Sequence, residues 1–259
     1  MASVVQHSVT TSMTRFVVLL LLAFPALADW RVVRDGVAAQ HFTRTTFEAD
    51  VVRVDLRDAD LRVIATDKAE RGLSVSEFAK RTHAIVAING DYFTERMETI
   101  GTAMGACGVW SKAKATRSEP WIAIGKKRAV IDHFSKKRTW MTGAVSGWPL
   151  LVDDCAVKAK LPGSDAFTRS KHRRTAVGVS GDGRWMYFVI VTGRGATLPE
   201  LATFLRELGA CTAVNLDGGS STSMWLDGKL VPGSANGRVA NHLAVIAAVD
   251  YSGCGRATQ

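Results

Sequence analysis

The chain has 259 residues, of which 47% are hydrophobic and 22% charged, so it is long enough for one large domain with its own core. Its formal net charge of +9 fits either a solvated basic surface or one that attracts an anionic polymer. Nucleic acid is a poor candidate, because no recognition helix or aromatic-basic motif accompanies the charge.

Residues 1–28 have the features of a secretory signal peptide: Arg15 before an apolar core at 16–24, then the small-x-small site 26–28. The apolar core is short for a bilayer span. We therefore expect cleavage, no stable membrane insertion, and a mature domain at 29–259 that is periplasmic or secreted. An uncleaved anchor is the alternative.

All four cysteines lie in the expected mature part, and an even number in an exported chain predicts two disulfides. Three pairings are possible and the sequence does not choose among them. Our expectation is Cys107–Cys155 with Cys211–Cys254. The wide spacing contains no Cys-x-x-Cys, which argues against thiol redox chemistry and a zinc knuckle.

Hydrophobic patterning predicts β structure along most of the chain, with helices where capping boxes occur. Ser74–Glu77 and Thr197–Glu200 are such boxes, and the second precedes leucines at helical spacing that end before Gly209. The predicted class is α+β: a single domain with a mixed or antiparallel β-sheet core and a few packed helices. Strands are expected at 51–56, 61–65, 84–88, 121–124, 129–131, 175–179, 185–191, 211–214 and 243–249.

Two basic clusters account for much of the positive charge, Lys126–Arg128 and Lys136–Arg138. The first lies between two apolar segments, which predicts the tip of a hairpin. A solvated tip is one interpretation of these clusters, and attraction to an anionic polymer such as a phosphate-bearing glycan is the other.

The same layout occurs twice: a capping box, a helix, an apolar strand, then Asn-x-Asp. The first copy ends in Asn89-Gly90-Asp91 and the second in Asn215-Leu216-Asp217, followed by Gly218 and Gly219. We infer that Asp91 and Asp217 lie at neighbouring strand ends, where the glycines let the backbone approach a ligand. The alternative for the first copy is an ordinary turn, because Asn, Gly and Asp are common turn residues.

Four blocks of the sequence resemble the phosphodiester glycosidase family, in the family's order. The longest, 205–224, contains Asn-Leu-Asp-Gly-Gly, and a weaker fifth block covers 238–243. Two positions depart from the family's pattern: Ser220 replaces a third glycine, and Asp91 stands where a glycine is usual. Asp217 is therefore the safer catalytic candidate. The other blocks are 87–93, 147–152 and 174–178.

The resemblance implies hydrolysis of a sugar-1-phosphodiester at the anomeric carbon, giving a free sugar and a phosphomonoester. We expect Asp217 to act as nucleophile or as base on water, with Asp91 as a possible partner carboxylate. Arg174 is the expected clamp on the phosphate, while alternation along the strand turns Arg173 away from it. The expected substrate-binding residues are Asn89, Gly90, Asn215, Gly218, Gly219, Ser220 and Asn241.

Each of these assignments has an alternative. Arg174 could form an ordinary ion pair, and Asn241 with His242 could cap the final strand. No cofactor is required by the implied reaction, although Asp217 and Asp91 could hold Ca²⁺ beside a phosphate. The serines at 220–223 lack the Gly-x-Ser-x-Gly elbow of serine hydrolases.

Two other functions compete with a glycosidase acting on an envelope or extracellular glycan. One is a non-catalytic module that binds anionic glycans through the basic surface. The other is a phosphodiesterase that cuts the P–O bond, which normally calls for a two-metal site that the sequence does not show.

Overall fold

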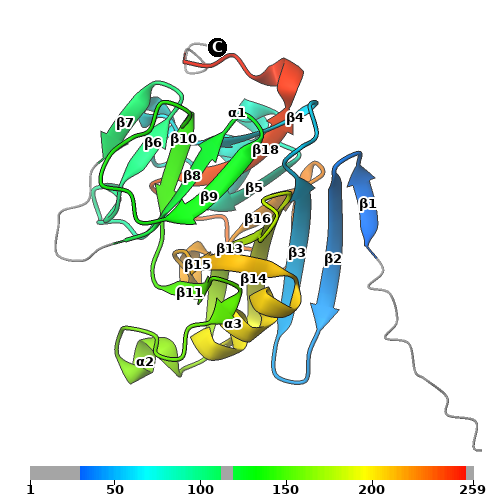
Figure 1. Cartoon of the computed structure of the whole chain (residues 1–259), viewed down its shortest axis with the longest axis vertical. Helices are drawn as coiled ribbons and strands as arrows, with labels where there is room; N and C mark the ends of the chain where they lie inside the picture. Colours follow the sequence, from blue (N-terminus) through cyan, green and yellow to red (C-terminus); the bar gives the residue numbers. More distant parts are fainter. Residues whose placement is uncertain (1–29, 112–118, 255–259) are drawn as a thin grey trace, which may run out of the picture.

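A computed structural model describes residues 30–111 and 119–254. The predicted signal peptide lies outside these residues. Within them, three β-sheets pack together with three helices, and every strand pairing is antiparallel (Figure 1). The predicted α+β class with a β-rich core is confirmed, and the sheets are antiparallel rather than mixed. No helix in the described ranges is both long and apolar enough to cross a membrane.

The largest sheet has eight strands in the order β1-β2-β3-β14-β13-β15-β11-β12. Its centre is the hairpin of β13 and β14, which the sequence predicts from the turn at 180–184. The strands are Arg31–Arg34 (β1), Val37–Thr43 (β2), Glu48–Asp55 (β3), Leu150–Asp153 (β11), Ala156–Val157 (β12), His172–Ser180 (β13), Trp185–Ala196 (β14) and Ala210–Asn215 (β15).

Two five-stranded sheets, ordered β17-β16-β5-β18-β4 and β7-β6-β10-β8-β9, complete the β structure. The strands of the first are Leu61–Ala65 (β4), Val86–Asn89 (β5), Met224–Leu226 (β16), Lys229–Leu230 (β17) and His242–Ala247 (β18). Those of the second are Ala103–Gly105 (β6), Gly108–Ser111 (β7), Trp121–Gly125 (β8), Arg128–Asp132 (β9) and Gly143–Ser146 (β10). The polar turn between β3 and β4 thus connects the largest sheet to the five-stranded sheet that contains β4.

Both predicted capping boxes begin helices. Ser74 and Glu77 cap α1 (Val75–Thr82), and Thr197 and Glu200 cap α3 (Leu198–Glu207). Gly209 follows α3 with a φ of 98°, a conformation that glycine adopts without strain. The structure adds a short helix, α2 (Asp165–Thr168), and three 3₁₀ turns at Lys68–Glu70, Gly219–Ser221 and Ala248–Asp250.

The main core lies where the three sheets meet and is filled by aliphatic side chains such as Val177, Ile88 and Ile122. A second core packs α3 against the largest sheet through Leu201 and Leu205. Each sheet therefore buries at least one face, which follows from strand side chains alternating between the two faces.

Two disulfides form, but the expected pairing is wrong. The bonds are Cys107–Cys254 and Cys155–Cys211, and no cysteine of the chain is free. The second pair follows from strand pairing: β11 runs antiparallel to β15, so continuing along β11 brings Cys155 to the beginning of β15.

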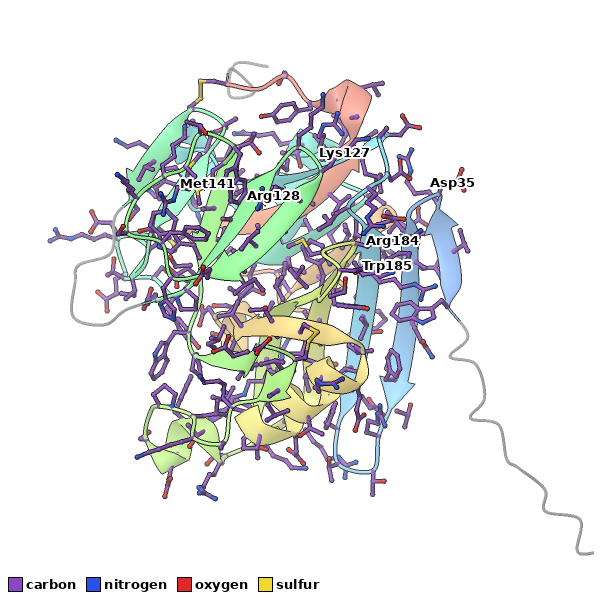
Figure 2. The ribbon with its side chains drawn as sticks, in the orientation of Figure 1. Asp35, Lys127, Arg128, Met141, Arg184 and Trp185 are labelled. Atoms are coloured by element: carbon purple, nitrogen blue, oxygen red, sulfur yellow. A yellow bond between two sulfur atoms is a disulfide. The ribbon has the colours of Figure 1, made fainter. Side chains whose placement is uncertain are left out.

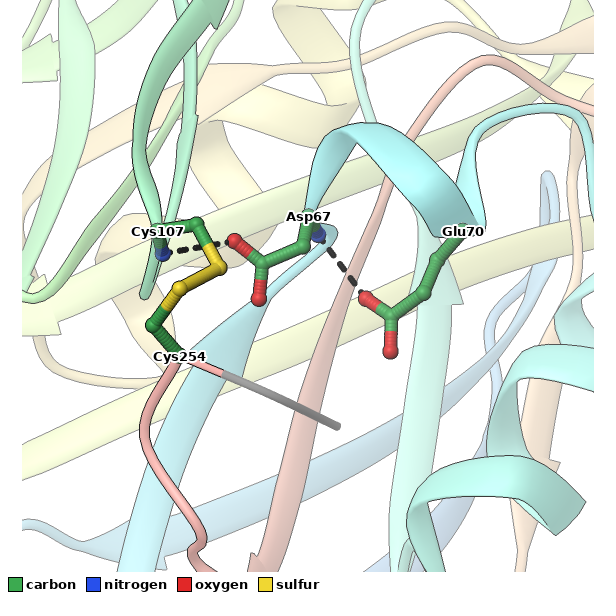
Figure 3. Close-up of a disulfide and its surroundings, with 4 residues drawn as sticks. All are labelled: Asp67, Glu70, Cys107 and Cys254. Carbon is green, nitrogen blue, oxygen red and sulfur yellow. Dashed lines mark hydrogen bonds between the residues drawn. A yellow bond between two sulfur atoms is a disulfide. The ribbon is translucent and has the colours of Figure 1, made fainter. Parts of the chain in front are cut away.

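The other disulfide joins the turn between β6 and β7 to the last described residue (Figure 3). A carboxylate oxygen of Asp67 accepts the Cys107 N–H at 2.8 Å, and Glu70 accepts the Asp67 N–H at 2.8 Å. Cysteine order along the chain does not predict this contact, because it depends on how the sheets pack.

Candidate active site

The candidate site lies where β5 and β15 end, although these strands belong to different sheets. The Asp217 N–H donates to the Gly90 carbonyl at 3.0 Å, and Asn89 Nδ2 donates to the Asp217 carbonyl at 2.7 Å. The two Asn-x-Asp segments are therefore joined, as the repeated layout predicts, but across a junction of two sheets rather than at adjacent strands.

Asn89 is the residue that holds this junction together. It is fully buried, and its Oδ1 accepts hydrogen bonds from Thr175 Oγ1 at 2.8 Å and from the Ser223 N–H at 3.0 Å. With the bond to the Asp217 carbonyl, one amide group connects four segments. Asn89 therefore positions Asp217, and its predicted contact with substrate stays a prediction.

The Asp217 carboxyl group is partly buried. Burial raises its pKa, although hydrogen bonds from Ser221 and from the Gly218 N–H act in the opposite direction. The Gly218 N–H lies 2.9 Å from Oδ1. A carboxylate with a raised pKa is a stronger base than an ordinary aspartate, which suits it to accept a proton in a reaction.

The glycines after Asp217 are required by space and by backbone conformation. A Cβ atom on Gly218 would lie 2.5 Å from the Arg173 carbonyl oxygen, and Gly219 has a φ of 58°. The Gly218 N–H bonds to the Asp217 carboxylate, and the predicted contact of Gly218 and Gly219 with substrate stays a prediction. Ser220 is exposed at the outside of this turn.

Arg174 is 3% exposed and bonds to backbone carbonyls. Its Nε donates to Ala196 at 3.0 Å, and its Nη2 donates to Phe167 at 2.7 Å and to Ser170 at 3.2 Å. Burial lowers its pKa, and the side chain stays cationic because a guanidinium does not deprotonate in proteins. These contacts fix the segment around α2, and the phosphate-clamp role of Arg174 stays a prediction.

Arg173 points to a different segment from Arg174, as alternation along the strand predicts. Its Nη2 donates to the Thr222 carbonyl at 3.1 Å and also to the Gly233 carbonyl. Its Nε is buried without a hydrogen-bond partner among the described residues. Of the two arginines, Arg173 is thus the one that contacts the turn after Asp217.

An aromatic cluster adjoins Asn215. Tyr92 Oη accepts a hydrogen bond from Asn215 Nδ2 at 2.6 Å and donates to the Trp148 carbonyl at 3.1 Å. Phe167 stacks on Trp148 with a centroid distance of 5.3 Å and meets Tyr92 edge-on at 6.5 Å. All three rings are half-buried. Trp148 lies in one of the family-like blocks, 147–152, whereas nothing in the sequence pattern singles out Phe167.

Asp91 is 1% exposed, and its carboxylate accepts the Tyr92 and Gly101 N–H groups, each at 2.7 Å. Its own N–H donates to Asn241 Oδ1 at 2.8 Å. A Cβ atom on Gly90 would lie 2.3 Å from that oxygen, so this position needs glycine. Asp91 and Asn241 therefore shape the loop after β5, and their roles toward substrate stay predictions.

His242 is held in the protein interior by packing and hydrogen bonds. It is fully buried, stacks on Phe78 at 4.4 Å, and its ring nitrogens contact Thr66 Oγ1 at 2.9 Å and the Leu73 carbonyl at 3.1 Å. Burial lowers its pKa to about 3, so the ring is neutral at physiological pH. In the described ranges, no group of three or more His, Cys, Asp or Glu side chains is arranged to hold a metal ion.

The comparisons with known proteins identify the family. The phosphodiester glycosidase family model matches residues 82–246, which is most of the chain, so the chain belongs to this family. The matched region includes Asn89, Asp91, Arg174, Asn215 and Asp217. No curated protein matches the chain.

Solved structures share the fold at low sequence identity. The catalytic domain of zebrafish N-acetylglucosamine-1-phosphodiester alpha-N-acetylglucosaminidase, auto-inhibited by its pro-peptide, aligns with a TM-score of 0.64 and 18% identity over 81% of each chain. A hypothetical protein from Synechocystis aligns with a TM-score of 0.60 and 17% identity over 82% of this chain, which spans 62% of that protein. A putative exported protein from Burkholderia pseudomallei gives 0.55 and 16% identity, covering 77% of this chain and 74% of that one.

Proposed function

We propose that this protein hydrolyses a sugar-1-phosphodiester at the anomeric carbon, releasing a free sugar and a phosphomonoester. The observation that carries the proposal is Asp217, a partly buried carboxyl group of raised pKa in the turn after β15, two residues beyond Asn215, whose amide bonds to the aromatic cluster. Membership of the phosphodiester glycosidase family and the likeness to the zebrafish catalytic domain support it.

In the proposed reaction, the bond between the anomeric carbon and the phosphate oxygen breaks, and its electron pair leaves with the phosphate. Water supplies the new oxygen on the sugar. Asp217 takes the proton from that water, or attacks the carbon first as a nucleophile. The departing phosphomonoester is already a weak base, so it needs less general-acid help than an alkoxide leaving group.

The leaving phosphate needs positive charge and hydrogen-bond donors. We assign the role of the phosphate-binding cation to Arg173, because its guanidinium contacts the turn that follows Asp217. Arg174 instead holds the α2 segment. Tyr92, Trp148 and Phe167 form the wall against which the sugar ring lies. Asp91 acts by shaping its loop, because both carboxylate oxygens already accept backbone N–H groups.

The proposed compartment is the periplasm or the exterior. Residues 1–28 resemble a signal peptide, and two disulfides are typical of an oxidising environment. The proposed substrate is therefore a glycosyl phosphate of an envelope or extracellular glycan. Mass analysis of the exported protein tests the compartment, and a mature amino terminus at residue 29 is the expected result.

The direct test is an NMR-followed incubation of the protein with UDP-N-acetylglucosamine and related sugar-1-phosphodiesters. Native protein should release free sugar, and Asp217→Asn should not. The first-formed anomer distinguishes retention from inversion. In ¹⁸O-labelled water, the label should enter the sugar; label in the phosphate would instead establish a phosphodiesterase that cuts the P–O bond.

The Asp217→Asn variant also separates lost chemistry from lost folding. Because burial raises the Asp217 pKa, ionisation of this group destabilises the folded state as the pH rises above the unfolded-state value of 3.8. The neutral amide avoids this cost, so the variant should be at least as stable as native protein at pH 7. An inactive but fully folded variant supports the catalytic assignment.

A non-catalytic module for anionic glycans is the second candidate, and the exposed basic clusters at 126–128 and 136–138 favour it. Native protein that binds a phosphate-bearing glycan, yet releases no sugar from any sugar-1-phosphodiester with or without Ca²⁺, would support this candidate and contradict the glycosidase.

A further inference from the structure

One surface groove is lined by Arg128 of the first basic cluster and by all three cations of the second. The other two cations of the first cluster lie at the adjoining hairpin tip. β8 and β9 form a hairpin in which Gly125 faces Arg128, so Lys126 and Lys127 lie at its tip (Figure 2). A groove of about 590 Å³ lies beside β9. Alternation places Arg128, Val130 and Asp132 along one side of it, and the loop 134–140, which carries the second cluster, forms the other side.

The six cations of these clusters are exposed, and none has an acidic partner within 4 Å among the described residues. Among the residues that the structure describes, Asp132 is the one carboxylate that lines the groove. Like charges gathered in this way repel one another, and the folded chain does not neutralise them. A polyanion bound along the groove would do so and would release counterions from itself.

Aromatic rings lie among these charges. The Arg128 guanidinium lies 4.2 Å from the centroid of Trp140. Phe134 packs edge-on against Trp140 at 6.3 Å and in a tilted arrangement against Trp121 at 5.9 Å. Phe134 and Trp140 are half-buried, so the loop is anchored to the sheet while part of each ring faces outward. Flat apolar faces between cations suit sugar rings that carry phosphate groups.

The groove also leads toward the candidate active site. Asp132, at one end of it, pairs with Trp121, and Trp121 pairs with Ser146 in β10. The chain then continues through Gly147 to Trp148, whose ring stacks on Phe167. A linear chain lying along β9, which spans ~13 Å from Arg128 to Asp132 at the usual rise per residue, would thus approach the aromatic cluster beside Asn215.

We propose that this groove binds a linear, phosphodiester-linked polysaccharide and that the same polymer delivers its glycosyl phosphate to Asp217. The second half of this statement rests on the proposed function, and the binding does not. The interaction is electrostatic in large part, so it weakens as the salt concentration rises.

The test compares a groove variant with a matched control. The groove variant carries Lys136→Gln, Lys137→Gln and Arg138→Gln; the control carries Arg34→Gln, Lys68→Gln and Lys160→Gln, three exposed cations outside the groove. Two probes are used: a soluble polysaccharide with phosphodiester linkages, longer than the groove, and UDP-N-acetylglucosamine as a small substrate.

We expect the groove variant to bind the polysaccharide about 10-fold or more weakly at low salt, with a shallower dependence of log Kd on log salt. The control variant should stay close to native protein, and turnover of UDP-N-acetylglucosamine should be unchanged in both. Equal binding by both variants would overturn the proposal. The proposal would also be overturned if native protein bound vesicles rich in anionic lipid and did not bind the polysaccharide.

The two proposals fail in different ways. If native protein binds the polysaccharide through the groove but cleaves neither probe, the groove stands and the glycosidase function fails. If UDP-N-acetylglucosamine is cleaved and the polysaccharide is neither bound nor cleaved, the function stands and the groove proposal fails.

Discussion

Replacement of Asn89 tests how the site is held together. The side chain is fully buried and makes three hydrogen bonds: one to the Asp217 carbonyl, one from Thr175 and one from the Ser223 N–H. Asn89→Ala leaves all three partners buried and without the hydrogen bond that Asn89 made to them. At about 1–3 kcal/mol for each unsatisfied buried group, with some relaxation, the free energy of unfolding should fall by about 3–5 kcal/mol.

This loss is a large share of the ~5–15 kcal/mol by which a typical domain is stable. Urea unfolding followed by tryptophan fluorescence measures it. Thr175→Val is the matched control, because it removes one of the three bonds and keeps the Asn89 amide in place. We expect it to cost about 1–2 kcal/mol.

Asn89→Asp removes the hydrogen bond that Asn89 donates and keeps the two that it accepts. The carboxylate still accepts from Thr175 and Ser223 but has no N–H to donate to the Asp217 carbonyl. Sugar release should therefore be lost, and stability should fall as well, because the new carboxylate is fully buried. A loss below about 1 kcal/mol for Asn89→Ala would refute this account of the junction.

Three further predictions follow from single positions. Gly218→Ala should destabilise the turn and abolish sugar release, because its Cβ would lie 2.5 Å from a backbone carbonyl oxygen; Gly237→Ala, with nothing within 4 Å, should behave as native protein in the same assays. Replacing Cys155 and Cys211 together by Ala opens a loop of 56 residues and should lower the free energy of unfolding by about 2–4 kcal/mol, and an unchanged urea midpoint would contradict this. His242 has a pKa of about 3 when folded and 6.5 ordinarily, so the unfolded chain binds its proton first and stability should decline as the pH falls from about 6.5 toward 3. His242→Gln should flatten that part of the stability–pH curve, and a curve identical to that of native protein would show that another group is responsible.

Local features of the sequence predicted local structure well. Both capping boxes begin helices because each box satisfies the helix N-terminus within four consecutive residues. The β13–β14 hairpin and the basic tip between β8 and β9 follow from short turns between apolar strands. The sequence also predicted the phosphodiester glycosidase family, because the motif around Asp217 is contiguous. The family match confirms this prediction.

Contacts between distant segments were decided by the tertiary structure. The cysteine pairing depends on which strands lie beside one another, and the expected pairing was wrong for that reason. Packing also decided that the β5 and β15 ends meet across two sheets, and that Arg173 rather than Arg174 contacts the turn after Asp217. The sequence by itself therefore determined which elements form and where the candidate carboxyl group lies in the chain. Only the packed fold set its surroundings, because burial and hydrogen-bond partners come from residues far apart in sequence.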